Sequence, residues 1–308
     1  MNPDRGAPPA EQAKALQRRF RALLDGDLRA ADAGYYPTSL LFKTGLREYL
    51  KVLPEGLLDL PRVLRRARSR RYAELPGDVD LGDYPHYYRR TFHWQSDGWL
   101  SAHSARIYDP AVELLFGGAA DIMRRAIVPD LVDAARAVDA PRLLDVACGT
   151  GRFLRLLGDL LPDARLEGLD LSPHYAEHAR GVAEGAVVTQ ANAEAMPYDD
   201  GAFDAVSCIF LFHELPRDAR ERVAAELFRV LRPGGTLAFL DSAQLVDAAE
   251  IRWFLDGFPE VYHEPYFKGW LKAPVEDLLR DVGFTVHAVR PTFVAKAVIA
   301  TKPAAVQP

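Results

Sequence analysis

Leu143-Leu144-Asp145-Val146-Ala147-Cys148-Gly149-Thr150-Gly151 is the stretch of sequence that decides the fold. Its apolar first half predicts a buried strand over 142–146, and its small residues predict a tight turn into a helix over 152–161. Small residues let the backbone approach a ligand closely, and the N–H groups at a helix start attract an anion or a carboxylate. The stretch therefore predicts a strand, a ligand-binding loop and a helix.

An acidic residue follows this loop at an informative distance. Asp170 lies nineteen residues after Gly151, at the end of the apolar run 166–169. An acid that ends the second strand of a doubly wound sheet can accept hydrogen bonds from both hydroxyls of a ribose. The loop and the acid together predict an adenosine-type cofactor on such a sheet.

The glycine spacing helps to distinguish between cofactors. A dinucleotide-binding loop has glycines in the pattern G-x-G-x-x-G, whereas Gly149 and Gly151 are followed by Leu154 in the third glycine position. A bulky residue there would obstruct the close helix–strand packing that a pyrophosphate loop requires. The sequence therefore argues against a nicotinamide oxidoreductase.

The pattern from Asp145 to Gly151 instead resembles motif I of the class I S-adenosylmethionine (SAM) dependent methyltransferases. Four later segments resemble further motifs of that family in the family's order: 170–173, 192–198, 203–216 and 231–237. The resemblance implies SAM as the cofactor and S-adenosylhomocysteine as its product. It also implies an α/β fold with a doubly wound, mostly parallel seven-stranded sheet whose last strand is antiparallel.

The resemblance also implies which residues contact SAM. Asp170 would bind the ribose, Asp145 would lie under the methionine end, and Asn192, where the family usually has Asp, would contact the adenine. The segment 107–118 resembles the N-terminal helix of the ubiquinone/menaquinone-biosynthesis type C-methyltransferases, which implies that Tyr108 contacts the cofactor. The expected cofactor contacts are Tyr108, Asp145, Ala147, Cys148, Gly149, Thr150, Gly151, Asp170, Leu171, Asn192, Ala193 and Phe210.

His213 and Glu214 follow the fourth expected strand, where a methyl acceptor would face the cofactor. Methyl transfer from a sulfonium needs a close, aligned and dry acceptor, and it needs a base only when the nucleophile carries a proton. A histidine can remove such a proton near neutral pH, but a histidine that bonds loop backbone would explain the position as well. Both residues are candidate catalytic residues, and no spacing of histidines or cysteines predicts a metal site.

The chain outside the cofactor motifs divides into three expected regions. These are a helical N-terminal extension over 1–80, an aromatic-rich cap with entry helices over 81–140, and the SAM-binding Rossmann-like domain over 141–308. A second aromatic-rich segment, 250–272, interrupts the last region after the fifth strand. We expect it to be a lid insertion that covers the acceptor pocket, although its aromatic residues could equally form a small core.

Helix signals are clearest before residue 140. Apolar residues at helical spacing over 13–24 predict a helix that Gly26 ends, and further helices are expected over about 40–53 and 57–67. Asp109-Pro110 predicts the start of another helix, because proline suits the first helical position. The last two strands are expected near 284–289 and 294–301.

Composition limits the classes of function. The 308 residues are 49% hydrophobic and 26% charged, as in an ordinary globular protein, and no window reaches the roughly 20 apolar residues of a membrane span. The net charge of −5 argues against a nucleic-acid partner. Two cysteines and a polar, proline-rich start without a signal-peptide core predict a cytoplasmic protein.

Positive charge is concentrated in the first part of the chain. Residues 1–90 contain 17 Lys and Arg against 12 Asp and Glu. This excess fits either a solvated helix face or peripheral contact with an anionic membrane surface. The basic residues cluster at Arg62, Arg65, Arg66, Arg68, Arg70 and Arg71.

The sequence thus predicts SAM-dependent methyl transfer to a small molecule, with an apolar or aromatic acceptor and C- or O-methylation favoured. A macromolecule methyltransferase is an alternative, but a base methyltransferase would carry an Asn/Asp-Pro-Pro-aromatic signature where 212–216 reads FHELP. A non-catalytic SAM-binding regulatory module is the other alternative. The acceptor's identity and the oligomeric state are not predicted.

Overall fold

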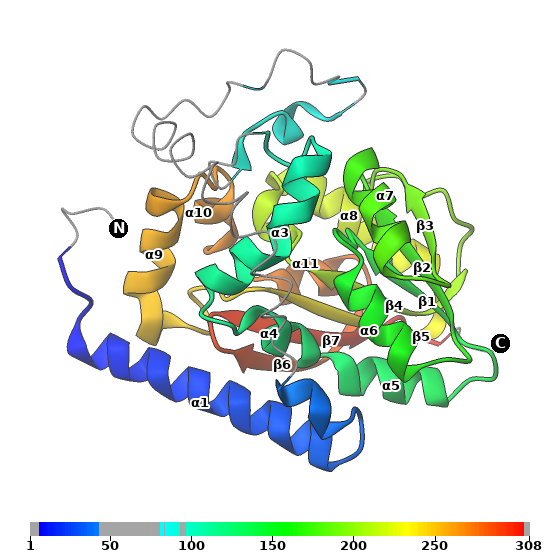
Figure 1. Cartoon of the computed structure of the whole chain (residues 1–308), viewed down its shortest axis with the longest axis horizontal. Coiled ribbons are helices and arrows are strands. Elements are labelled where there is room, and N and C mark those ends of the chain that lie inside the picture. The colour runs from blue at the N-terminus through cyan, green and yellow to red at the C-terminus, as the bar shows by residue number, and fades with distance from the viewer. Residues whose placement is uncertain (1–5, 43–74, 76–80, 83, 93–96, 305–308) are drawn as a thin grey trace.

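One seven-stranded sheet, in the order β3-β2-β1-β4-β5-β7-β6, forms the centre of the molecule (Figure 1). The computed structural model describes residues 6–42, 75, 81–82, 84–92 and 97–304. Strands β1 to β5 are parallel, and β7 runs antiparallel to both β5 and β6. This confirms the mostly parallel sheet with an antiparallel last strand. The strands are β1 Arg142–Val146, β2 Arg165–Asp170, β3 Val187–Gln190, β4 Phe203–Ile209, β5 Leu231–Ser242, β6 Thr285–Thr292 and β7 Ala295–Thr301.

Helices cover both faces of this sheet because its central strands are apolar on both faces. In β1, Leu143 packs into the core on one face, while Leu144 and Val146 pack into the core on the other. Helices α5, α6 and α7 contribute to the first core, and α8 and α11 contribute to the second. The helices between β1 and β6 are α6 Arg152–Leu160, α7 Pro173–Val182, α8 Arg217–Val230, α9 Arg252–Val261, α10 Phe267–Trp270 and α11 Val275–Asp281.

The strand order places the binding loops. From β1 the chain moves to β2 and β3 on one side, and it then crosses back to β4 on the other side of β1. Loops that leave neighbouring strands in opposite directions open a crevice at their carboxyl ends, which is where ligands bind in such sheets. Val146 and Cys208 pair across β1 and β4 just before these two loops.

Two strand boundaries differ from those expected. The β6–β7 hairpin turns at Phe293 and Val294, so Pro291 lies within β6 rather than in the connection. An edge strand tolerates a proline because the missing N–H faces away from the ladder. Strand β5 begins at Leu231, which pairs with Phe203 ahead of a register shift in β4, so the whole motif segment 231–237 lies within the strand.

The first helix is longer than expected. Helix α1 spans Ala10–Asp32 and passes through Gly26, so the expected end at that glycine is wrong. Tertiary contacts extend the helix, because the Asp27 carboxylate forms a buried, bidentate ion pair with the Arg125 guanidinium at 2.7 and 2.6 Å. Figure 1 shows α1 lying along the outside of the body, against α4 and β6.

The entry helices also begin elsewhere. Helix α3 starts at Ala102, where the Ser101 hydroxyl accepts a hydrogen bond from the Ser104 N–H, and Pro110 lies inside the helix. The expected start at Asp109-Pro110 is therefore wrong. The Ser101 cap begins the helix, and packing of α3 against α7 holds it through Pro110 although a proline removes one backbone bond. The elements of this region are η3 His86–Tyr88, α3 Ala102–Leu115, α4 Ala120–Arg125 and α5 Val128–Arg136.

Several expectations concern residues outside the described part of the chain. Of the expected helix over 40–53, the structure describes only the end of a 3-10 helix, η2, that spans Thr38–Phe42. The expected helix over 57–67 and the whole basic cluster fall outside the described residues. No helix among the described residues is long and apolar enough to cross a membrane.

Candidate cofactor and acceptor site

A cavity lies at the carboxyl ends of β1, β2 and β4, in the crevice that the strand order predicts. It contains about 1040 Å³ of empty space, part of which is open to solvent. Every expected cofactor contact lines it except Gly151, and Glu214 lines it as well. His213 does not belong to the lining of this cavity.

Asp170 is held rigidly at the end of β2. One carboxylate oxygen accepts a hydrogen bond from the Gly149 N–H and the other accepts one from the Ser172 N–H, both at 2.9 Å. Burial raises the pKa of Asp170 to about 6, although these two hydrogen bonds lower it. The acid therefore connects the glycine loop to the start of α7, where Ser172 caps the helix as expected.

Asp145 lies on the cavity wall at the end of β1. Its carboxylate accepts a 2.6 Å hydrogen bond from the Ser207 hydroxyl of β4. Burial raises the pKa of Asp145 to about 7, against the lowering effects of Ser207 and of the Arg124 guanidinium. The two acids of the cavity, Asp145 and Asp170, thus both titrate within reach of neutral pH.

Leu154 fits its position because β2 has a glycine opposite to it. A Cβ atom built on Gly168 would lie 2.9 Å from both the Leu154 Cδ2 atom and the Cys148 Sγ atom. The leucine and cysteine side chains fill the space that a third loop glycine leaves empty in dinucleotide-binding proteins. Cys148 is therefore a buried packing residue as well as part of the cavity wall.

Gly151 supports the loop from outside the cavity. Its φ is +77°, and a Cβ atom on it would lie 2.9 Å from the Cα and Cβ atoms of Ala179 in α7. The glycine is required for the close approach of the loop to α7 rather than for direct contact with a ligand.

Two non-glycine residues of the cavity wall have left-handed backbones. Ala147 has φ +57° and Phe210 has φ +54°. Such conformations cost of order 1–3 kcal/mol and are concentrated at functional sites. At Phe210 the backbone turns out of β4 while its N–H still donates to the Leu240 carbonyl at 2.8 Å. This turn directs the chain from the strand into the segment that contains His213.

Helix α3 closes the cavity beside the glycine loop. Tyr108 lines the cavity and contacts Tyr175 edge-on, with ring centroids 5.7 Å apart. Asp109 accepts a 2.8 Å hydrogen bond from the Thr150 hydroxyl, which joins α3 to the loop after β1. The expectation that Tyr108 faces the cavity thus agrees with its position.

A pair of arginines in the wall was not predicted. Arg124 and Arg152 both bind the Asp121 carboxylate, and together they lower the pKa of this acid to about 2, although its burial acts in the opposite direction. Arg152 directly follows the glycine loop, which is a signal that sequence reasoning could have used. Nothing in the sequence places Arg124 there, because α4 reaches the cavity only through its packing on α1 and α3.

Aromatic residues cover one side of the cavity, and they come from the region before α3. Tyr87, Tyr88 and Trp99 line it. No described residue of the expected lid, 250–272, is part of the lining. Instead, Phe267 and Trp270 are buried in the core beneath β5, and Tyr266 meets Tyr87 edge-on at 6.4 Å. The described residues of 250–272 thus lie partly in the core and partly behind the aromatic side of the cavity, and their role as a lid stays a prediction.

His213 is oriented by β5. The 3-10 helix η5, Phe212–Glu214, follows β4, and the His213 Nδ1 atom lies 2.5 Å from an Asp241 carboxylate oxygen. The Nε2 atom lies 3.5 Å from Glu214 and 3.8 Å from Glu264. Burial alone lowers the pKa of His213, but the carboxylates of Asp241, Glu214 and Glu264 raise it well above the usual value.

Comparison with known proteins agrees with this geometry. Residues 143–235 match the family described as "Methyltransferase domain". The chain contains a class I SAM-dependent methyltransferase domain. The cofactor of this domain is SAM, and the segment of the methyltransferase domain that matches the family includes β1 to β4 and the start of β5.

Relatives of the methyltransferase domain include methyltransferases whose names refer to quinones and to a malonyl group. A demethylmenaquinone methyltransferase of Thermus thermophilus is 38% identical over 139 residues, which cover 44% of this chain and 60% of that protein. A ubiquinone/menaquinone biosynthesis C-methyltransferase of Methylobacterium nodulans is 37% identical over 145 residues, which cover 44% and 55%. A malonyl-[acyl-carrier protein] O-methyltransferase of Methylococcus capsulatus is 31% identical over 168 residues, which cover 53% and 59%.

The chain spans about half the length of the curated relatives it matches. Among solved structures, a TehB-like SAM-dependent methyltransferase from Corynebacterium glutamicum has a TM-score of 0.47 and 16% identity, and the match covers 66% of this chain and all of that one. The family match covers residues 143–235, and the regions before it belong to a part of the chain that this match does not include.

Proposed function

We propose that this protein transfers the methyl group of SAM to a carbon or oxygen atom of an apolar or aromatic small molecule. The observation that carries the proposal is a single cavity whose wall is polar in part and aromatic in part. The polar wall contains the fixed acid Asp170 and the glycine loop, and the aromatic wall contains Tyr87, Tyr88 and Trp99, of which Trp99 lies next to Ser172 at the start of α7.

The polar wall fits SAM. Asp170 ends β2 with its carboxylate fixed by two backbone N–H groups, and a carboxylate so placed can accept hydrogen bonds from ribose hydroxyls. Asn192 and Ala193 line the cavity next to it and would contact the adenine. Asp145 offers negative charge to the amino group and sulfonium of the methionine end. Bound SAM supplies a methyl group on a sulfonium, ready for in-line displacement.

The aromatic wall fits an apolar acceptor. Large aromatic side chains bury much area and exclude water, which an acceptor needs for alignment with the methyl group. The names of the matched relatives point the same way, because two of them act on menaquinone or ubiquinone precursors. We therefore propose a quinone-like or phenolic acceptor, with C-methylation or O-methylation.

Glu214 and His213 have different proposed roles. Glu214 lines the cavity and would contact the acceptor's polar group directly. His213 lies behind it, and the neighbouring carboxylates favour its protonated form, in which it cannot accept a further proton. We propose that His213 acts as a positioning residue for Glu214, so this arrangement favours Glu214 over His213 as the group that meets the acceptor.

Labelled SAM tests the proposal. The full chain would be incubated with methyl-deuterated SAM and host-cell extract, and mass spectrometry would search the lipid, aqueous and macromolecular fractions. We expect deuterated methyl in a small lipid-soluble product, and none with Asp170→Asn. Label on protein or nucleic acid would overturn the small-molecule acceptor, and bound SAM without any labelled product would favour a regulatory module.

The catalytic roles can be tested separately from cofactor binding. Glu214→Gln keeps the shape of the side chain and is expected to lower kcat at least tenfold, with the Kd for SAM changed less than about threefold. Glu167→Gln is the matched control, because Glu167 is a buried carboxylate of β2 that pairs with Arg142 and does not line the cavity. Equal kcat values for the two variants would show that Glu214 takes no part in the reaction.

A further inference from the structure

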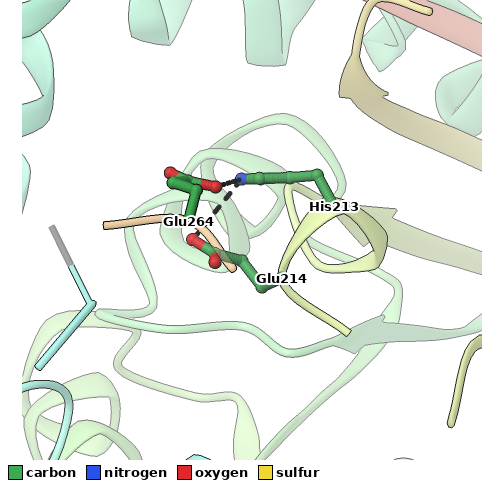
Figure 2. Close-up of side chains that lie close together, drawn as sticks. All are labelled: His213, Glu214 and Glu264. Atoms are coloured by element: carbon green, nitrogen blue, oxygen red, sulfur yellow. Dashed lines mark ion pairs between the residues drawn. The ribbon is translucent and has the colours of Figure 1, made fainter. Parts of the chain in front are cut away.

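The side chains of His213, Glu214 and Glu264 converge on one buried point (Figure 2). One ligand atom from each lies within 4.8 Å of those of the other two. The two glutamates come from elements that are fifty residues apart, η5 and the loop between α9 and α10, so their spacing in sequence gave no sign of this cluster.

The geometry points to a divalent first-row transition metal, of the Mn²⁺ or Zn²⁺ class, bound by His213, Glu214 and Glu264 at the acceptor end of the cavity. One imidazole nitrogen and two carboxylate oxygens form a mixed donor set that suits these ions, whereas Mg²⁺ and Ca²⁺ favour oxygen alone. Three protein ligands leave at least one coordination position for a substrate atom.

The distances need only small adjustments. Metal–ligand bonds of about 2.1 Å in a tetrahedral arrangement place neighbouring ligand atoms roughly 3.4 Å apart. The His213 Nε2 atom is 3.5 Å from the Glu214 Oε1 atom and 3.8 Å from the Glu264 Oε2 atom. Figure 2 shows both carboxylates turned toward this ring nitrogen, so a cation would draw the nitrogen and each carboxylate together by a few tenths of an ångström, while the two glutamate oxygens lie within 4.8 Å of each other.

Asp241 supplies the outer contact that metal-binding histidines usually have. Its carboxylate lies 2.5 Å from the His213 Nδ1 atom and also accepts hydrogen bonds from the Phe212 and Ser242 N–H groups, at 2.7 and 2.6 Å. A carboxylate on one ring nitrogen fixes the proton there and leaves the lone pair of the other nitrogen directed at the metal. The ring is thus held in the orientation that metal binding requires, and a bound cation would take the place of the Nε2 proton that the ligand-free protein favours.

The position of the cluster beside the cavity suggests what a bound cation would do. Glu214 belongs both to the cluster and to the cavity wall, so the cluster adjoins the space in which the acceptor would lie. A cation at this point would bind and orient an oxygen atom of the acceptor, in a step that forms and breaks no covalent bond. This role rests on the proposed methyl transfer, whereas the binding site itself does not.

Metal binding can be measured without any acceptor. The full chain would be freed of metal with EDTA, dialysed and titrated with MnCl₂ or ZnCl₂ by calorimetry, and bound Mn²⁺ would be followed by electron paramagnetic resonance. We expect one equivalent bound, a Kd on the order of ten- to a hundredfold weaker for Glu264→Gln, and no such loss for the Glu167→Gln control. SAM affinity and circular dichroism show whether each variant is folded, and Glu214→Gln replaces Glu264→Gln if the latter is not.

Two results would overturn the site: no binding of either ion to the wild-type chain, or binding that neither glutamine variant weakens. The test is distinct from that of the proposed function. If the chain binds Mn²⁺ at this site but transfers no methyl group, the result would support the metal site and contradict the proposed reaction. If the rate of methyl transfer is equal with and without the bound ion, the result would support the proposed reaction and contradict the role given to the cation.

Discussion

Protonation of Asp170 is expected to control the affinity for SAM. The folded, ligand-free protein holds the pKa of Asp170 at about 6 because the acid is buried. Ribose hydroxyls donate hydrogen bonds, so the charged carboxylate binds them better than the neutral acid does. About nine-tenths of the groups are charged at pH 7 and about one-tenth at pH 5, which predicts a Kd roughly tenfold weaker at pH 5 from this group alone.

Asp170→Asn isolates this effect. Alanine would also leave both the Gly149 and the Ser172 N–H groups without their acceptor, whereas asparagine keeps a carbonyl oxygen for one of them. Loss of the charge from two hydrogen bonds of about 1.5–3 kcal/mol each, which are roughly twice as strong as neutral ones, predicts a Kd about 10- to 100-fold weaker at pH 7.

Calorimetric titration with SAM from pH 5 to pH 7.5 would measure both effects. Asp145, with a pKa of about 7, titrates in the same cavity, so the contribution of Asp170 is the difference between the wild-type and Asp170→Asn profiles. Parallel profiles, or a variant that binds SAM as tightly as the wild type at pH 7, would refute the assignment of Asp170 to the ribose.

Three further predictions concern stability, each measured by urea denaturation. Gly168→Ala is expected to lower the free energy of unfolding by about 1–3 kcal/mol because its Cβ atom would lie 2.9 Å from Leu154. Leu154→Ala in the same chain should recover part of that loss, and a Gly168→Ala variant as stable as the wild type would refute the packing argument. Gly151→Ala should cost at least ~1 kcal/mol because it combines a positive φ with a contact to helix backbone, and unchanged stability would contradict this. Asp27→Ala should cost about 3–5 kcal/mol because it leaves the Arg125 guanidinium buried without its carboxylate, and a loss below ~1 kcal/mol would show that α1 docks without this pair.

Short-range patterns predicted the methyltransferase domain well. The apolar run before Asp145, the small residues after it and the acid at Asp170 all depend on neighbours within one βαβ unit, so the sequence alone locates strand, loop and helix. The expected cofactor residues line one cavity for the same reason, because parallel strands present their carboxyl ends at one edge. Their contact with SAM remains a prediction.

Helix boundaries outside this unit were predicted less well. Gly26 is a helix breaker by propensity, yet α1 continues through it because its outer turns bury Ala31 and pair Asp27 with Arg125. Pro110 suggested a helix start, yet α3 already begins at Ser101, whose cap is visible in the sequence but competes with other serines. In both places tertiary packing outweighed a local preference of about 1–3 kcal/mol.

The sequence by itself determined the doubly wound sheet and the cofactor loop, since periodicity and turn chemistry act over a few residues. Only the tertiary structure decided what surrounds His213. Asp241 comes from β5 and Glu264 from the connection before α10, and strand order and packing bring them within hydrogen-bonding or ion-pairing distance of the histidine. Side chains so distant along the chain leave no periodic signal, because their meeting depends on how whole elements pack against one another.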